Sequence, residues 1–384
     1  MSVIFEAENY RGLKKVRWAP SGVCALVGPN GSGKTTLLRL PELFRYAVQR
    51  GFNEAVGIVG GFWGLKHLDA GSGEPLVLSA TLRSLRYQIR VATVSTVGIA
   101  GFEESVFEHE TQILHRQYGE RRYEFRGAMH ELNGEFSALR DAALRTGEQG
   151  MVVMNATLQE CHAYSEYKLS QLFQYGSRIG AATQLDPSGE NVFSVLQNWS
   201  GSFEDKMKYR FVVTAMKAAF PGVFDDLGFV PQGQSVGANF LPVGGTQGIP
   251  FSNGPRGLLV GLLHLVAVAG AGRWERIMID EFENSLHPHA IRSLLQSIRD
   301  WLDEDELDTR CVAISTHSPV VMDEFNDEKE NLFVMQPGRE VQPVAVTDLA
   351  DREWLDQFAL GRLYTGGDIG SPNRAITKPE PTAA

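Results

Sequence analysis

The stretch GPNGSGKTT, residues 28–36, constrains this chain more than any other part of its sequence. It matches the P-loop pattern G-x-x-x-x-G-K-[ST], with both glycines, the lysine and the hydroxyl residue in place. The apolar run 23–27 before it predicts a buried strand, and residues 37–40 after it begin a helical pattern. A strand, a glycine-rich loop and a helix N-terminus direct backbone N–H groups at phosphate. The alternative is a purely structural turn between a strand and a helix.

Composition places the chain among ordinary globular proteins. Its 384 residues are 43% hydrophobic and 10% aromatic, enough for two or three domains or for one large α/β domain with an insertion. The formal charge of −10 gives no global attraction to DNA or to an acidic membrane, although it leaves room for a local basic patch. The apolar run 257–272 is shorter than the about 20 residues of a membrane span, so we expect a core helix there. Three cysteines, without metal spacing, and no signal-peptide pattern favour a reducing cytoplasm: Cys24, Cys161 and Cys311.

Periodicity predicts an alternation of strands and helices. We expect edge strands in residues 1–27, a helix over 35–50, a glycine-rich loop over 57–74 and antiparallel strands between 76 and 125. The region 127–184 is rich in Ala, Leu, Glu, Gln and Arg and predicts helices over 129–145 and 157–175. Further elements are expected as helices over 191–199, 203–219 and 288–302 and as strands over 227–230, 276–279 and 311–315.

A second chemical motif follows the strand 276–279. That apolar run ends in Asp280-Glu281, which is a Walker B pattern. The aspartate would hold the magnesium shell, and Glu281 would orient or deprotonate the water that attacks the γ-phosphate. The later strand 311–315 leads to His317, a candidate contact for the same phosphate.

Two further patterns suggest a binding site, but a structural interpretation is favoured for each. His287 and His289 flank a proline, but no third ligand is near them in sequence, so we do not assign a metal there. Arginines and tyrosines alternate between residues 113 and 125, which could mark a nucleic-acid surface. A solvated strand face is the favoured interpretation of that segment.

These motifs together carry a family resemblance. GPNGSGKTT, FSNGPRG, IMIDEFENSLHPH and CVAISTHSP, in that order, resemble the P-loop, signature loop, Walker B with D-loop, and switch histidine of ABC-type ATPases. The segments ENYRGLKKV, LDPSGENVFSVL, FPGVFDD and LGRLYTGGDIG are similar to standalone AAA/ABC ATPases. Those proteins are related to RecF, to the heads of structural-maintenance-of-chromosomes (SMC) proteins and to the overcoming-lysogenization-defect nucleases.

The resemblance implies an α/β fold of the ABC-ATPase type. It combines a mixed-sheet core and an antiparallel β subdomain with a helical insertion. The expected parts are 1–126 with the P-loop, a helical lobe over 127–221, a second part of the head over 222–370 and a disordered tail over 371–384.

The resemblance also implies a set of site residues. Glu281 and His317 would be catalytic, Thr35 and Asp280 would bind Mg2+, and Asn284 and Ser285 would lie in the D-loop. Ser252, Asn253 and Gly254 would complete the site of a second copy. ATP would be bound by Arg11 and by the P-loop residues Gly28, Pro29, Asn30, Gly31, Ser32, Gly33, Lys34, Thr35 and Thr36.

Departures from the family pattern narrow the expected function. The signature reads SNGPRG rather than LSGGQ, the region 127–184 lacks a sustained heptad repeat, and the 67 residues after His317 leave no room for a TOPRIM nuclease domain. No glutamine is assigned to the Q-loop. We therefore expect a cytoplasmic ATPase switch that forms a homodimer or a higher even oligomer, contacts no membrane, and controls a separately encoded effector such as a nuclease or toxin. Antiphage defence or DNA repair is the expected setting. The alternatives are a RecF-like DNA-binding repair ATPase and, less favoured, the ATPase subunit of a membrane transporter.

Overall fold

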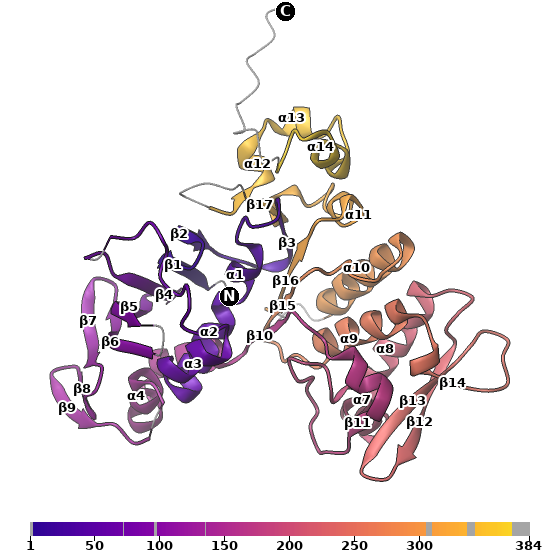
Figure 1. The fold of residues 1–384 in the computed structure, drawn as a ribbon, viewed down its shortest axis with the longest axis horizontal. Helices are drawn as coiled ribbons and strands as arrows, with labels where there is room; N and C mark the ends of the chain where they lie inside the picture. Colours follow the sequence, from indigo (N-terminus) through magenta and orange to yellow (C-terminus); the bar gives the residue numbers. More distant parts are fainter. Residues whose placement is uncertain are drawn as a thin grey trace, which may run out of the picture.

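Three β-sheets organise the part of the chain that the computed structural model describes, which comprises residues 3–71, 73–95, 98–134, 136–304, 309–335 and 342–370. Figure 1 shows one sheet in the left-hand lobe, one running through the middle of the molecule and one in the right-hand lobe. Segments far apart in sequence meet in the middle sheet. That sheet therefore decides which residues can form a common site.

The middle sheet is mostly parallel. Its strand order is β10-β15-β16-β3-β17-β18, and only the β17–β18 pairing is antiparallel. Because parallel strands all end at the same edge, the residues that follow β10, β15, β16 and β3 meet there. The strands are β3 (Gly22–Val27), β10 (Cys161–Tyr164), β15 (Arg276–Ile279), β16 (Cys311–Thr316), β17 (Leu332–Val334) and β18 (Val344–Ala345).

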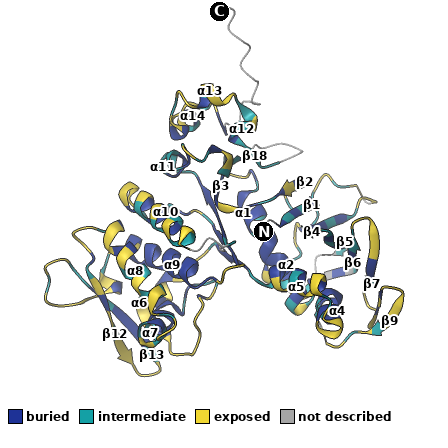
Figure 2. Ribbon diagram, turned by 180° about the vertical axis from the view of Figure 1, so that it is seen from behind, coloured by how far each residue is buried: buried dark blue, intermediate teal, exposed yellow. Residues whose placement is uncertain are grey.

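Both faces of the middle sheet are covered, which explains its nearly continuous apolar strands. In β3, Ala25 and Val27 face the core of the right-hand lobe, whereas Cys24 and Leu26 face the core of the left-hand lobe. Figure 2 shows these central strands as buried. The sheet thus forms the wall shared by two hydrophobic cores.

The left-hand lobe is built on an antiparallel sheet of order β2-β1-β4-β5-β6-β7-β8-β9. Its strands are β1 (Ile4–Tyr10), β2 (Leu13–Trp18), β4 (Leu76–Leu82), β5 (Leu85–Ser95), β6 (Gly98–Glu108), β7 (Thr111–Gln117), β8 (Arg122–Phe125) and β9 (Ala128–Glu131). Its helices are α1 (Lys34–Leu38), α2 (Leu40–Arg50), α3 (Phe52–Ile58), α4 (Ala138–Thr146) and α5 (Gln149–Gln159).

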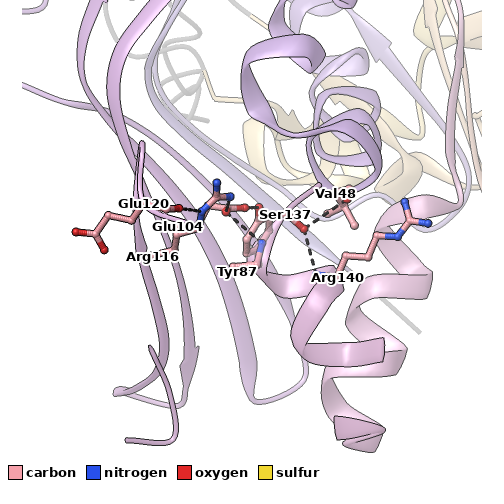
Figure 3. Close-up of polar contacts among 8 residues, drawn as sticks. Val48, Tyr87, Glu104, Arg116, Glu120, Ser137 and Arg140 are labelled. Atoms are coloured by element: carbon pink, nitrogen blue, oxygen red, sulfur yellow. Dashed lines mark hydrogen bonds and ion pairs between the residues drawn. The ribbon is translucent and has the colours of Figure 1, made fainter. Parts of the chain in front are cut away.

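A buried carboxylate joins that sheet to α4 (Figure 3). Glu104 is 2% exposed and accepts hydrogen bonds from Tyr87 Oη at 2.6 Å and from the Arg116 guanidinium at 2.8 Å. It also accepts from the backbone N–H of Ala138, at the start of α4. The negative charge therefore has a cationic partner and two further donors, as a buried charge requires.

The right-hand lobe combines helices with a small antiparallel sheet of order β11-β13-β12, to which β14 adds through β13. Its elements are α6 (Leu169–Tyr175), β11 (Ser177–Arg178), α7 (Val192–Gly201), α8 (Lys206–Ala219), β12 (Asp226–Gln232), β13 (Ser235–Leu241), β14 (Ile249–Pro250), η1 (Phe251–Asn253), α9 (Arg256–Ala269) and α10 (Pro288–Asp303). The remaining elements are α11 (Pro319–Asp323), η2 (Lys329–Asn331), α12 (Val346–Leu349), α13 (Arg352–Leu355) and α14 (Leu360–Gly366).

Most of the elements expected from periodicity are confirmed. The helix expected over 35–50 is broken at Arg39 into α1 and α2, with Pro41 in the first turn of α2. The apolar run 257–272 is confirmed as a core helix, since α9 is buried along nearly its whole length. None of the described helices is long and apolar enough to cross a membrane. The tail 371–384 lies outside the described residues.

The helices expected over 129–145 and 157–175 are wrong in part. Residues 128–131 form β9, and the first of these helices begins only at Ala138. Residues 161–164 form β10, which pairs in parallel with β15 of the middle sheet. Local composition favours helix here, but burial on both faces beside β15 makes strand pairing the better solution. The region expected to form a helical lobe therefore contributes a strand to the middle sheet.

Candidate nucleotide site

The P-loop turns tightly between β3 and α1. Gly33 has φ +89°, and a Cβ there would stand 2.7 Å from Leu13 Cδ2. At Gly28 a Cβ would stand 2.2 Å from the carbonyl oxygen of Met335. Glycine is required at both positions, because no larger residue fits the backbone or the space. Lys34 Nζ donates to the carbonyl oxygens of Gly28 and Pro29, at 2.8 and 3.0 Å.

The Walker B aspartate meets the P-loop through a hydroxyl. Thr35 Oγ1 donates to Asp280 Oδ2 at 2.7 Å. Ser315, at the end of β16, donates to the other carboxylate oxygen of Asp280 and accepts the backbone N–H of Glu281 at 2.9 Å. Three parallel strands thus supply one hydrogen-bonded chain at their common edge, as the topology requires.

Glu281 leaves the sheet in an unusual backbone conformation. Its φ is +49°, in the left-handed region that non-glycine residues seldom adopt, and its side chain is exposed. Such conformations persist where the surrounding structure holds them, and they concentrate at functional sites. Here the hydrogen bond from its N–H to Ser315 is one restraint.

His317 lies at the end of β16 beside the same carboxylates. Its backbone N–H donates to Glu283 Oε1 at 2.7 Å, and its Nδ1 lies 3.4 Å from the hydroxyl of Tyr364. Glu283 Oε2 is buried without a hydrogen-bond partner among the described residues. Tyr364 comes from α14, so the C-terminal helices contribute directly to the site.

Burial and neighbouring charges act on the site's cationic side chains. Burial lowers the pKa of Lys34, whereas the nearby carboxylates, led by Asp280, act to raise it. Burial also lowers the pKa of His317, and Lys34 acts in the same direction. His317 is therefore neutral at pH 7 and can offer either a ring N–H or a lone pair.

The donor set suits a magnesium nucleotide. A threonine hydroxyl and an aspartate carboxylate are the hard oxygen ligands that Mg2+ prefers. Ser32 Oγ, within the loop, is buried and has no hydrogen-bond partner among the described residues. The turn and the N-terminus of α1 supply the N–H groups that recognise phosphate. The P-loop residues, Asp280, Glu281 and His317 are thus brought together, as the motifs predict for one hydrolytic centre.

The expected signature residues are placed elsewhere. Ser252 and Asn253 are exposed in η1, and Gly254 precedes α9 in the right-hand lobe. Figures 1 and 2 show α9 and α1 on opposite sides of the middle sheet. Among the described contacts, no hydrogen bond or ion pair joins these three residues to the P-loop of the same chain.

The D-loop contacts the first turn of α9. Asn284 and Ser285 are exposed, and Ser285 has φ +64°. A Cβ at Gly257 would stand 2.3 Å from the Ser285 carbonyl oxygen, so α9 and the D-loop touch backbone to backbone. Farther along α9, His264 stacks on Phe282, with ring centroids 4.9 Å apart. α9 therefore packs directly against the segment that follows the Walker B aspartate.

Arg11 binds a neighbouring loop. Its guanidinium donates to the carbonyl oxygens of Val59 and Gly61, at 3.4 and 3.0 Å, and stacks over Tyr10. Its expected contact with the nucleotide stays a prediction. Three residues of the site were assigned no role from the sequence: Ser315, Glu283 and Tyr364. All three lie in family-like segments: Glu283 in IMIDEFENSLHPH, Ser315 in CVAISTHSP and Tyr364 in LGRLYTGGDIG.

The histidine pair and the arginine–tyrosine segment make contacts that belong to the fold. His287 caps α10 by accepting the N–H of His289, and His289 Nε2 contacts the carbonyl oxygen of Ala218. In the arginine and tyrosine segment, Arg116 pairs with buried Glu104, and Tyr123 donates to Asp141 at 2.6 Å. These contacts favour a structural role for that strand face.

Comparisons with known proteins bear on the family and the fold. The family model described as "AAA domain, putative AbiEii toxin, Type IV TA system" matches residues 173–323. A crystal structure of an SMC head bound to the C-terminal winged-helix domain of ScpA aligns with TM-score 0.50 and 13% identity, covering 90% of this chain and 98% of that one. The SMC head domain from Thermotoga maritima aligns with TM-score 0.37 and 10% identity, over 87% and 95%. A search of curated proteins found no significant match.

The chain has the fold of an ABC/SMC-type ATPase head. The segment similar to the AAA family model includes the expected signature loop, the Walker B residues and His317, and it begins after the P-loop. ATP binding and ATP hydrolysis, typically with Mg2+, are general properties of proteins with that fold. The resemblance of the motifs to ABC, SMC and RecF ATPases is thereby confirmed.

Proposed function

We propose that this ATPase head is a switch that dimerises around ATP, hydrolyses it slowly and controls a separate effector. The proposal rests on the separation of the P-loop and Walker B residues from the expected signature residues within one chain. The hydrolytic half is assembled in one chain, whereas the exposed signature residues lie on the other side of the middle sheet. A second copy related by a two-fold axis would bring each signature loop to the other copy's P-loop.

Each site residue has a role that follows from its position. Lys34 would exchange its two carbonyl contacts for phosphate oxygens, and α1 and the loop N–H groups would hold the remaining charge. Glu281, exposed and held at its N–H by Ser315, would orient or deprotonate the attacking water. His317, kept neutral by burial, would hydrogen-bond to the γ-phosphate. A magnesium ion bound by Thr35 and Asp280 would neutralise developing phosphate charge.

The trans half of the site would come from Ser252, Asn253 and the start of α9. The loop is exposed, and α9 is a 14-residue helix whose N-terminus carries partial positive charge. The contact between Gly257 and Ser285 gives a route from this loop back to the Walker B segment of its own chain. Engagement by the second copy would therefore be sensed at Asp280 and Glu281.

A separate effector is the natural target of such a switch. The matched family's description names a putative toxin of a type IV toxin–antitoxin system, and the matched SMC head is bound to a winged-helix domain of another protein. By analogy, we place this chain in a defence or genome-maintenance setting in which the ATP-bound dimer controls a partner protein.

The test uses Glu281→Gln, which keeps shape but removes the carboxylate. We expect this variant with ATP and Mg2+ to elute as a dimer in size-exclusion chromatography and to hydrolyse ATP at least about a hundredfold more slowly than wild type. Glu204→Gln, at an exposed glutamate of the right-hand lobe, is the matched control and should behave like wild type. Introducing Ser252→Arg into the Glu281→Gln background should abolish the dimer. An ATP-loaded monomer in Glu281→Gln would refute the proposal.

A further inference from the structure

A second cluster of ligand-type side chains lies at the opposite edge of the middle sheet. Glu160 precedes β10, His162 lies within it, and Glu275 precedes β15. One ligand atom from each residue lies within 4.8 Å of the other two. The nucleotide site is at the carboxyl ends of these strands, so the cluster is separated from it by the length of the strands.

His162 is the feature that points to a ligand. Its side chain is 6% exposed, so the imidazole is almost completely removed from solvent. Nε2 lies 3.8 Å from Glu160 Oε2 and 3.9 Å from Glu275 Oε2, beyond hydrogen-bonding distance. Ligand atoms that are each about 2.1 Å from a shared metal ion lie roughly 3.0–3.5 Å from one another. Small rotations of the three side chains would therefore bring their ligand atoms to metal-binding distances.

The surroundings support a bound cation. Gln184 Nε2 donates to Glu275 Oε1 at 2.6 Å, which fixes that carboxylate and leaves Oε2 facing His162. Arg45 lines the same cavity and adds one positive charge beside the two carboxylates.

A route and room for further ligands are present. The cluster opens into a cavity of about 460 Å³, lined by residues of both lobes that include Arg45 of α2 and Lys208 of α8. Water molecules in this cavity could complete a coordination shell. We propose that Glu160, His162 and Glu275 bind a divalent first-row transition-metal ion, with Zn2+ the best match to two carboxylate oxygens and one imidazole nitrogen.

Such an ion would join the starts of β10 and β15 to the cavity between the lobes. β15 is the strand that carries Asp280 and Glu281 at its other end. The ion would fix the position of that strand and would be lost at low pH, because its ligands must be deprotonated. This site is independent of the proposed switch, since it shares no residue with the nucleotide site.

The test measures metal directly. Protein carrying Asp280→Asn, which disables the magnesium ligand of the nucleotide site, is treated with chelator and titrated with Zn2+ by calorimetry, without nucleotide. Co2+ serves as a visible-absorption probe of the same site. We expect one equivalent to bind, with His162→Asn and Glu275→Gln in that background each lowering affinity at least about tenfold.

The matched control is His109→Asn. His109 is exposed in a turn at φ +53°, a conformation that asparagine accepts, so zinc binding should be unchanged. Glu275→Gln keeps the shape of the side chain, and circular dichroism checks the fold of each variant. Failure of the folded Asp280→Asn protein to bind either metal would overturn the proposal. So would undiminished binding in both His162→Asn and Glu275→Gln.

Discussion

Thr35 Oγ1 donates a 2.7 Å hydrogen bond to Asp280 Oδ2, joining side chains that are 245 positions apart in the sequence. The bond ties the P-loop helix α1 to the end of β15. It also places two hard oxygen donors side by side before any metal is bound. The two motifs recognised in the sequence therefore form one site in the folded chain.

Removing that hydroxyl should weaken binding of ATP with its metal. We expect Thr35→Ala to lower affinity for Mg2+–ATP at least about tenfold, because a metal ligand is lost. Affinity for ATP in chelator should change little. Titration of a fluorescent ATP analogue with and without Mg2+ measures both. Thr111→Ala, at an exposed threonine that begins β7, is the control. An equal loss with and without metal would indicate a damaged P-loop instead.

The buried ion pair of the left-hand lobe should matter for stability. Arg116→Ala leaves Glu104, 2% exposed, without its cationic partner, so we expect the free energy of unfolding to fall by about 3–5 kcal/mol. Arg122→Ala breaks an exposed pair with Glu131 and should cost less than about 1 kcal/mol. Urea denaturation compares the two variants. Similar losses in both would mean that the buried pair is not a principal support of α4.

The close contact between α9 and the D-loop can be tested with one methyl group. Gly257→Ala should push the Ser285 carbonyl away and destabilise the protein by about 1–3 kcal/mol. If the contact transmits the state of the signature loop, the variant should also weaken ATP-dependent dimerisation. Gly201→Ala, at the end of α7 with no atom within 4 Å of the new carbon, is the control. Normal dimerisation by a folded Gly257→Ala protein would argue against the link.

His264 should make the protein sensitive to acid. It is fully buried on α9, with Nδ1 3.1 Å from the Tyr167 hydroxyl and Nε2 3.2 Å from the Phe282 carbonyl oxygen. Burial lowers its pKa to about 4. The unfolded chain has the ordinary value, about 6.5, so it binds the proton first as pH falls. The stabilisation is complete above about pH 6.5 and is lost toward pH 4.

The expected contribution of this one group between pH 7 and pH 5 is about 2 kcal/mol of unfolding free energy. Urea denaturation at the two pH values should show a smaller loss in His264→Gln than in wild type. His109→Asn, at an exposed histidine, should keep the wild-type loss. Equal pH dependence in wild type and His264→Gln would contradict the assignment.

The site residues that belong to short local motifs could be predicted from the sequence. The P-loop is recognised by glycines at a fixed spacing. The Walker B motif is recognised by an apolar run that ends in Asp280-Glu281. Ser315 and Glu283 lie in recognised motif segments, but the sequence assigned them no role, because their contacts form only when β16 lies beside β15. Neither residue type is unusual at its position in the sequence.

The strand β10 could not be predicted from local sequence. Its four residues, CHAY, lie between segments whose composition favours helix. Only the pairing with β15 and the burial of both faces select the extended conformation. Glu160, His162 and Glu275 were missed for the same reason, since 113 positions separate His162 from Glu275 and the sheet brings them together.

The position of β3 in the middle sheet also sets the order in which the protein can be completed. Both neighbours of this strand, β16 and β17, come from residues beyond 310. During synthesis, β3 therefore has neither of its strand partners until most of both lobes has emerged from the ribosome. The candidate nucleotide site can be assembled only after β16 has been made, because Ser315 lies in that strand and His317 follows it. A chain that ended before β16 would lack both residues.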